Sequence, residues 1–198
     1  RSFNSIAMFG SSGLRWDGDG RKQEFPTLHV SPSLSSVLQI RPVLGRALLP
    51  EDADDAAGKV MMIGHEFWLS RLAGNPGIIG QTLRVDDAVR TVVGILPPGL
   101  EFPMERERGS GTGSIVKGGV QAFWMPLRIQ GPDRTSRGAR MFRVIDRLQP
   151  GVTRDAAETE LATLSRRLAM DHPVSNRGGH FEPVGLRDKV LGRTRQGI

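Results

Sequence analysis

The stretch that most constrains the fold is VTRDAAETELATLSRRLAMDHP, residues 152–173. Apolar residues recur in it every three or four positions, which places them on one face of a helix. This apolar stripe consists of Ala157, Leu161, Leu164 and Leu168. Thr153 is suited to cap the N-terminus of the helix, and Pro173 prevents its continuation. The pattern predicts one long amphipathic helix whose apolar face must pack against the rest of the fold.

A shorter helix is predicted at the start of VSPSLSSVLQIRPVLGRALLPED, residues 30–52. Ser31 is a favourable N-cap, and Pro32 suits the first helical position because its missing N–H is not needed there. The apolar face of this helix consists of Leu34, Val37 and Leu38. The residue before Pro42 is driven out of the helical region, so the helix ends near Ile40. The segment therefore predicts a helix whose C-terminal end is set by Pro42. It carries no side chain of obvious chemical reactivity.

The remaining pattern alternates short strands with helices. Strands are predicted at 59–64, 122–127 and 139–151, a helix at 65–77 with a left-handed cap at Gly74, a β-hairpin at 81–99, and a last strand and turn at 180–190. This mixture indicates an α+β fold. A strand and a helix occur near each end of the chain, so we expect residues 1–60 and 137–198 to form one βαβ-containing subdomain. Residues 61–136 are then an inserted, hairpin-rich subdomain.

Composition narrows the function classes. The 198 residues include no cysteine, which excludes disulfides, thiolate metal sites and cysteine nucleophiles, and no apolar run approaches the length of a membrane span. The net charge of +6 comes from 27 Lys and Arg against 21 acidic residues. The densest basic cluster consists of Arg134, Arg137, Arg140, Arg143 and Arg147. These arginines do not share one face if 141–148 is a strand, so we expect an ordinary solvated surface and no nucleic-acid partner.

Four kinds of candidate site occur in the sequence. The histidines are His29, His65, His172 and His180, and His65-Glu66 lacks the second histidine of a zinc-binding H-E-x-x-H helix. The acids at 51–55 lack the spacing of an EF-hand, so a solvated acidic loop is expected. The glycine-rich stretch 109–119 lacks the Gly-Lys-Ser/Thr order of a phosphate loop, and the serines of SPSLSS stand outside any G-x-S-x-G motif. We predict no catalytic, cofactor-binding or metal-binding residue, and no enzyme.

Several stretches together resemble the MacB-like periplasmic core domain of ABC-transporter permeases. The first is VSPSLSSVLQIRPVLGRALLPEDAD, with V-S-P, G-R and E-D in the family's order. The second, VMMIGHEFWLSRLAGNPGIIGQTLRVDDAVRTVVGILPPGLEFP, is similar to the family's strand, Trp-containing helix, Gly-Asn-Pro linker and V-V-G return strand. The stretches FWMPL, FRVIDRLQPGVTRDAAETEL and LRDKVLG follow in the same order. The resemblance covers nearly all of residues 1–198 and is closest to the Acidobacteria-type branch of efflux permeases.

The resemblance implies an extracytoplasmic domain between two transmembrane helices, with a porter-like subdomain from the chain ends and an inserted sabre-like subdomain. We then expect both ends to continue into membrane helices at the periplasmic face of a bacterial inner membrane. The implied partners are the membrane-embedded remainder of the permease, a second permease copy, a cytoplasmic ATPase subunit and a periplasmic adaptor or lipoprotein. The implied function is to transmit transmembrane movement to substrate efflux. A substrate- or partner-docking module without a mechanical role is the alternative.

Three positions depart from the family pattern. Ser35 stands where the family has Phe or Tyr, and Gln39 stands where it has Gly. Asp86-Asp87 replaces the D-G of the hairpin turn, at a position that favours positive φ. These departures concern the packing of the first helix and the strain of one turn.

Overall fold

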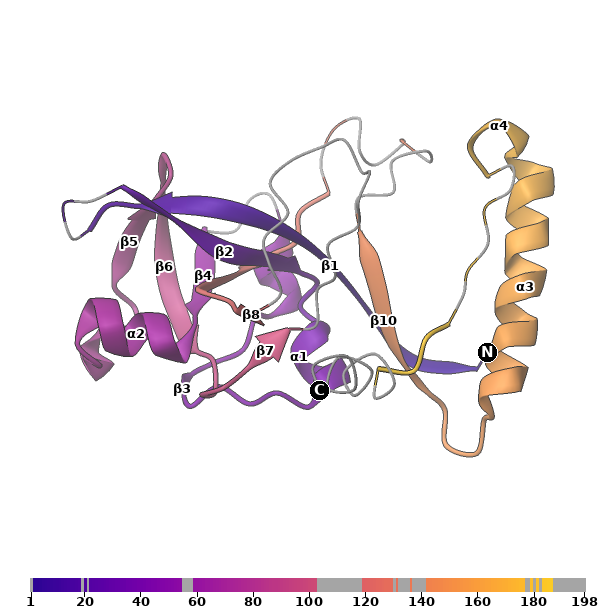
Figure 1. Ribbon diagram of the computed structural model, residues 1–198, viewed down its shortest axis with the longest axis horizontal. Coiled ribbons are helices and arrows are strands. Elements are labelled where there is room, and N and C mark those ends of the chain that lie inside the picture. Colours follow the sequence, from indigo (N-terminus) through magenta and orange to yellow (C-terminus); the bar gives the residue numbers. More distant parts are fainter. Residues whose placement is uncertain are drawn as a thin grey trace, which may run out of the picture. The chain divides into compact units, whose positions relative to one another are not determined.

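The computed structural model describes residues 2–18, 20, 22–54, 59–102, 119–129, 131, 136, 142–176, 179, 181 and 183–186 (Figure 1). The chain divides into two compact units. The smaller unit comprises Arg1–Ser5, Ile129–Met141 and Asp146–Ile198, and the larger comprises Ile6–Arg128 and Phe142–Ile145.

A mixed sheet has the order β10-β1-β2-β9-β4-β6-β3, with β5 paired to β6, and all of its strands except parts of β1 and β10 lie in the larger unit. Its strands are β1 (Phe3–Trp16), β2 (Gln23–Val30), β3 (Leu44–Gly45), β4 (Val60–Ile63), β5 (Thr82–Val85), β6 (Ala88–Ile95), β9 (Phe123–Pro126) and β10 (Arg143–Leu148). β2 pairs antiparallel with β1 and parallel with β9, and β4 is antiparallel to β9 and parallel to β6. A separate two-stranded sheet joins β7 (Glu101–Phe102) and β8 (Gly119–Val120).

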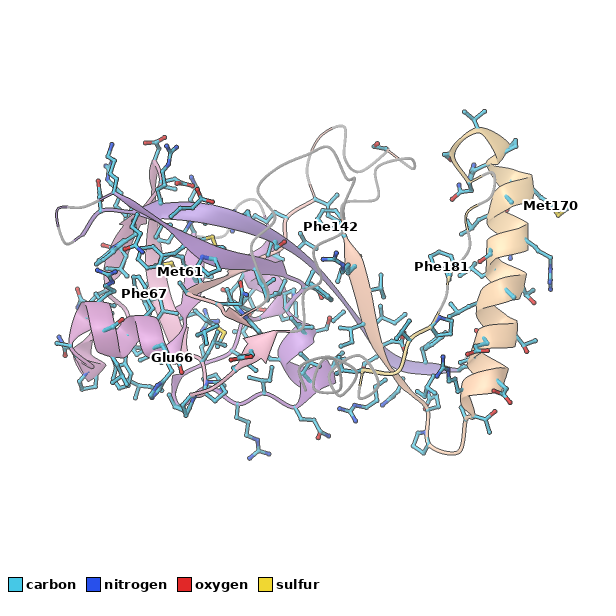
Figure 2. The ribbon with its side chains drawn as sticks, in the orientation of Figure 1. Met61, Glu66, Phe67, Phe142, Met170 and Phe181 are labelled. Carbon is cyan, nitrogen blue, oxygen red and sulfur yellow. The ribbon has the colours of Figure 1, made fainter. Side chains whose placement is uncertain are left out.

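Each face of this sheet carries its own hydrophobic core. On one face, α1 (Leu34–Leu38) packs with Leu28, Met62 and Trp124. On the other face, α2 (His65–Leu72) places Phe67 among the aromatic rings of Trp16, Phe25 and Phe123, with ring centroids 5.1, 5.1 and 4.8 Å away (Figure 2). The central strands β4 and β9 are buried on both faces, which explains why their sequences are continuous apolar runs.

Most predicted elements of the larger unit are confirmed. The strands at 60–63 and 123–126, the helix at 65–72 and the hairpin of β5 and β6 all lie where the sequence predicted them. The end of α2 differs in detail, because Ala73 and Gly74 are both left-handed, with φ of 52° and 65°. The hairpin turn contains Asp86 at φ 51°, as the sequence predicted for a turn that favours positive φ.

The smaller unit contains α3 (Arg154–Asp171), which is the predicted long helix, and the short α4 (Pro173–Asn176). Thr153 caps α3 by accepting a hydrogen bond from the backbone N–H of Ala156 at 3.3 Å, as predicted. Ser2 is held from two sides, since its N–H donates to Glu160 Oε2 at 2.7 Å and its carbonyl accepts from Gln149 N at 2.8 Å. None of the helices among the described residues has both the length and the apolar character needed to cross a bilayer.

The predicted last strand is wrong for the residues that are described. Residues 181 and 183–186 form no strand. Instead, the N–H of Phe181 donates to Ser165 Oγ at 3.1 Å, and the carbonyl of Pro183 accepts from Arg154 Nη2 at 3.0 Å (Figure 2). The segment is therefore bonded to side chains of α3, and its proline could not donate to a sheet in any case.

The predicted apolar stripe of α3 is also partly wrong. Ala157 and Ser165 are the buried residues of α3, whereas Leu164 is 43% exposed. Because a helix turns by about 100° per residue, the direction midway between Ala157 and Ser165 differs from that of Leu164 by about 60°. The buried face is thus rotated towards Ser165, whose hydroxyl bonds Phe181, and Leu164 lies at its margin.

Candidate functional site

The first part of the family-like segment, residues 30–54, is fastened to β1 by two serines. Ser31 donates its N–H to the carbonyl of Met8 at 2.8 Å, and its Oγ accepts from Met8 N at 2.9 Å. Ser33 Oγ donates to the carbonyl of Ile6 at 2.8 Å. The expected N-cap role of Ser31 is wrong, because its hydroxyl bonds β1 and α1 begins only at Leu34. The serines of SPSLSS therefore serve a structural connection.

The C-terminus of α1 ends at a residue whose backbone adopts the left-handed conformation. Gln39 has φ 57°, and its N–H bonds the carbonyl of Ser36 at 3.2 Å, while Ile40 N–H bonds that of Ser35 at 2.8 Å. This pair of bonds is the Schellman arrangement, in which glycine is favoured at the left-handed position. The segment ends its helix as predicted, near Ile40, but with a residue that is strained there.

The chain then crosses β6 at close range. Gly45 has φ 75°, and a Cβ atom placed on it would lie 2.3 Å from the carbonyl oxygen of Val93. A Cβ on Gly94 would lie 2.2 Å from the carbonyl oxygen of Arg46. Both glycines are therefore required by backbone contact, which gives a physical reason for the G-R and V-V-G motifs.

An ion pair with a buried carboxylate fixes the end of the segment. Arg46 donates to both carboxylate oxygens of Asp52, at 2.6 and 3.1 Å, and Leu49 N–H donates to Asp52 Oδ2 at 2.8 Å. Arg128 donates to the backbone carbonyl of Asp52 at 3.0 Å. Asp52 is only 5% exposed, so the expectation of a fully solvated acidic loop is wrong at this residue.

The charges of this pair stabilise each other. Burial acts to raise the pKa of Asp52, but the hydrogen bonds from Arg46 and Leu49 and the charges of Arg46 and Arg128 outweigh it, so the net pKa is lowered. The hydrogen bond to Asp52 raises the pKa of Arg46. The pair is therefore ionised at neutral pH and acts as a structural clamp.

The three histidines that the structure describes lie on separate elements. His65 begins α2 and stacks edge-on against Trp68 at 5.5 Å, and His172 follows α3, where its N–H bonds Leu168. His180 lies outside the described residues. Within the described part of the chain, no group of three or more His, Asp or Glu side chains is placed to hold a metal ion.

His29 has a polar partner that the sequence did not reveal. Its Nε2 lies 2.9 Å from Ser12 Oγ, because β1 and β2 pair in a register that brings them to one face. Burial, followed by the charge of Arg90, lowers the pKa of His29. Among the described residues, no carboxylate hydrogen-bonds the His29 ring, so the third member of a serine–histidine catalytic triad is not found there.

Two other predicted features fall largely outside the described residues. Of the glycine-rich stretch 109–119, only Gly119 is described, and it lies in β8. Of the arginine cluster, Arg143 and Arg147 are described, and both lie on β10.

Comparison with known proteins places the chain in a family. The family model of the MacB-like periplasmic core domain matches residues 3–164. The crystal structure of the periplasmic region of MacB from Actinobacillus actinomycetemcomitans is similar, with 15% sequence identity, a TM-score of 0.64, and coverage of 100% of this chain and 78% of that chain. No curated protein matches the sequence.

A second solved structure has the same fold. The extracellular domain of the ABC-type transporter YknZ from Gram-positive bacteria is 12% identical, with a TM-score of 0.59 and coverage of 88% of this chain and 79% of that chain. The predicted α+β class agrees with the mixed sheet and few helices that these structures share with the chain. The chain belongs to the family of MacB-like periplasmic core domains, and it is an extracytoplasmic domain of a MacB-like ABC-transporter permease.

Proposed function

We propose that this domain transmits conformational change from the membrane-embedded part of its permease to a substrate outside the membrane, in efflux or extrusion. The observation that carries the proposal is the fixation of segment 30–54 at its start, middle and end. Ser31 and Ser33 join it to β1, Gly45 joins it to β6, and the backbone carbonyl of Asp52 accepts a hydrogen bond from Arg128. The Arg46–Asp52 ion pair ties two residues of the segment to each other. A segment held in this way moves with the sheet as one body, because packed interiors deform little.

The proposed partners follow from the same family. They are the membrane-embedded remainder of the permease, a second permease copy, a cytoplasmic ATPase subunit, and a periplasmic adaptor or lipoprotein. The domain lies at the periplasmic face of a bacterial inner membrane in this proposal, and ATP hydrolysis resides in the separate subunit. The division into a porter-like subdomain of 1–60 with 137–198 and a sabre-like subdomain of 61–136 is part of the same proposal.

The clamp provides a direct test in the full-length permease with its ATPase. Asp52→Asn removes the charge that Arg46 bonds, whereas Glu51→Gln removes an exposed neighbouring charge and serves as the matched control. We expect Asp52→Asn to retain ATP hydrolysis and to lose most transport, while Glu51→Gln keeps both. The assay temperature is one at which the isolated Asp52→Asn chain keeps its native circular dichroism, so that a loss of transport does not report unfolding.

The docking alternative predicts a different result. If the domain only binds a partner, the loss of transport in Asp52→Asn should match the loss of its complex with the adaptor or lipoprotein. Co-purification with that partner measures how much of the complex remains. Full transport and full ATP hydrolysis by folded Asp52→Asn would contradict a mechanical role for the clamp.

Crosslinking tests the movement itself. The 198-residue sequence has no cysteine, so Met170→Cys, at a position that is 81% exposed, introduces a thiol that is unique within the domain, and the permease used has any cysteine outside the domain replaced. In the full-length permease, a bifunctional crosslinker that joins two copies should block transport, and cleavage of the crosslink should restore it. Undiminished transport by fully crosslinked permease would favour a passive docking module.

A further inference from the structure

The chain passes between its two compact units at four points. These crossings are Ser5–Ile6, Arg128–Ile129, Met141–Phe142 and Ile145–Asp146. Movement that travels along the chain from the smaller unit to the larger one enters at a crossing. The element of the larger unit that is bonded to the chain next to a crossing therefore receives this movement first, because coupling is carried by packed side chains and hydrogen bonds.

Next to the first crossing, the larger unit holds β1 through Ser33. Ile6 is the first residue of the larger unit, and its carbonyl accepts a hydrogen bond from Ser33 Oγ at 2.8 Å. The paired register of β1 with β2 ends at Phe9 and Val30, so Ile6 lies beyond the end of β2. The start of segment 30–54 thus extends the bonding of β1 from the end of β2 to the crossing.

Ser33 acts together with Ser31 in a chain of hydrogen bonds. Ser31 Oγ accepts from Met8 N–H at 2.9 Å and lies 3.0 Å from Ser33 Oγ. A serine hydroxyl has one hydrogen, and that of Ser33 is donated to Ile6, so Ser31 is the donor to Ser33. Ser33 stands at the N-cap of α1, but its side chain makes no capping hydrogen bond. Its hydroxyl hydrogen serves β1 instead of the helix.

The second crossing is bonded to both ends of the same segment. Arg128 is the last residue of the larger unit before this crossing, and it donates from Nη2 to the carbonyl of Asp52 at 3.0 Å. The preceding residue, Leu127, donates its N–H to the carbonyl of Val30 at 2.8 Å. Segment 30–54 therefore holds the chain at this crossing as well.

The last crossing also begins at the core of α1. Ile145, the last residue of the larger unit on β10, packs against the core that contains Leu34 and Val37. On the smaller unit's side of the first crossing, Ser2 is bonded to Glu160. Each unit thus holds its own part of β1.

We propose that segment 30–54 receives the movement of the smaller unit at the first two of these crossings, and that Ser33 and Arg128 are the positioning residues that transfer it. This inference rests on the proposed function and names the residues through which transmission acts. Each of these residues contributes one hydrogen bond to the segment's hold on a crossing. Loss of one bond leaves the other in place, whereas loss of both weakens the hold at both crossings.

The hold on β1 is tested first in the purified 198-residue chain. Ser33→Ala removes the hydroxyl donor and Ser33→Thr keeps it. Ser36→Ala is the matched control, because this exposed side chain makes no hydrogen bond among the described residues. In Ser33→Ala, hydrogen exchange at the Met8 amide should become about five-fold faster, because one hydrogen bond contributes about that factor to local opening. Unchanged exchange would show that Ser33 does not hold β1 and would overturn the proposal.

The transfer of movement is tested in the full-length permease with its ATPase. Ser33→Ala and Arg128→Gln should each lower the amount of substrate transported per ATP hydrolysed, and the double variant should lose most of it while ATP hydrolysis continues. Ser33→Thr should transport as the unsubstituted permease does. Assays are run at a temperature at which each isolated variant chain keeps its native circular dichroism.

A stability control separates transfer from folding. Ile63 is fully buried in the core beneath α2, and Ile63→Val removes one methyl group there, so it lowers stability without touching either hydrogen bond. Transport per ATP by Ile63→Val should stay unchanged. A loss equal to that of the double variant would overturn the inference, because the effect would then follow stability.

Full transport per ATP by the folded double variant would also overturn the inference. The crosslink through Met170→Cys separates this failure from that of the proposed function. If the crosslink blocks transport while the double variant transports normally, transmission stands and the route through Ser33 and Arg128 is wrong. If neither change affects transport, the inference and the proposed function fail together.

Discussion

Segment 30–54 in the larger unit and α3 in the smaller unit are stabilised in opposite ways. The segment contains little regular secondary structure. Its residues are fixed by close backbone contact with β6, by the buried carboxylate of Asp52 and by the fully buried Leu34. α3 is a regular helix of 18 residues in which only Ala157 and Ser165 are buried. In this chain, the regular apolar periodicity of α3 therefore predicts a helix that is mostly exposed. The irregular sequence of segment 30–54 instead belongs to a region with more buried contacts.

The largest effect in this comparison is expected from matched leucines. Leu34→Ala should lower the free energy of unfolding by about 2–5 kcal/mol, because Leu34 is 0% exposed within a packed core. Leu164→Ala should cost less than about 1 kcal/mol, because Leu164 is 43% exposed. Urea denaturation of both variants measures the difference. Equal losses would show that α3 buries Leu164 in solution, and the contrast between the two regions would fail.

The second effect concerns the clamp. Asp52→Asn should cost about 2 kcal/mol, below the usual 3–5 kcal/mol for a broken buried pair, because the side chain of Arg46 is 42% exposed. Glu51→Gln, at the exposed neighbour, should change the free energy of unfolding by less than about 0.5 kcal/mol. Thermal and urea denaturation at pH 7 check both values, and an unchanged stability of Asp52→Asn would show that the clamp does not fix the segment.

The clamp also has a pH signature. Because folding lowers the pKa of Asp52, its stabilising contribution is present above the unfolded pKa of about 4 and is lost as pH falls through the lower folded value. The stability difference between the unsubstituted chain and Asp52→Asn should therefore shrink below about pH 4.

The third effect tests the exit of α1. Gln39→Gly should raise the free energy of unfolding by up to about 1 kcal/mol, because it relieves a left-handed side-chain conformation. Ser36→Gly, in the helical part of the same segment, should instead lower it by about 0.5–1 kcal/mol. Destabilisation by Gln39→Gly would mean that the side chain of Gln39 contributes more than the strain costs.

These residues also show how far sequence reasoning reaches. The helix exit, the strained Asp86 turn and the Thr153 cap were predictable, because each depends on dihedral preference or on a local hydrogen bond. The 14-residue β1 was missed, since its glycines and serines have low strand propensity and its formation depends on pairing with β2 and on β10 beside it in the sheet. The partners of Asp52 and His29 were missed for the same reason, because Arg128 and Ser12 reach them only through the fold.

The smallest effect is expected from His29, which is only partly buried. Folding lowers its pKa through burial and the charge of Arg90, so the folded state favours the neutral ring. Below the unfolded pKa of about 6.5, the unfolded chain binds a proton more readily than the folded chain, and stability falls with pH until the folded pKa is reached. Urea denaturation between pH 7.5 and pH 5 should therefore show a loss of stability that His29→Gln reduces, with His65→Gln as the histidine control. Because Asp52 acts only near and below pH 4, an identical pH dependence in His29→Gln and the unsubstituted chain would show that folding does not lower the pKa of His29, so that the folded chain accepts a positive charge on this ring as readily as the unfolded chain does.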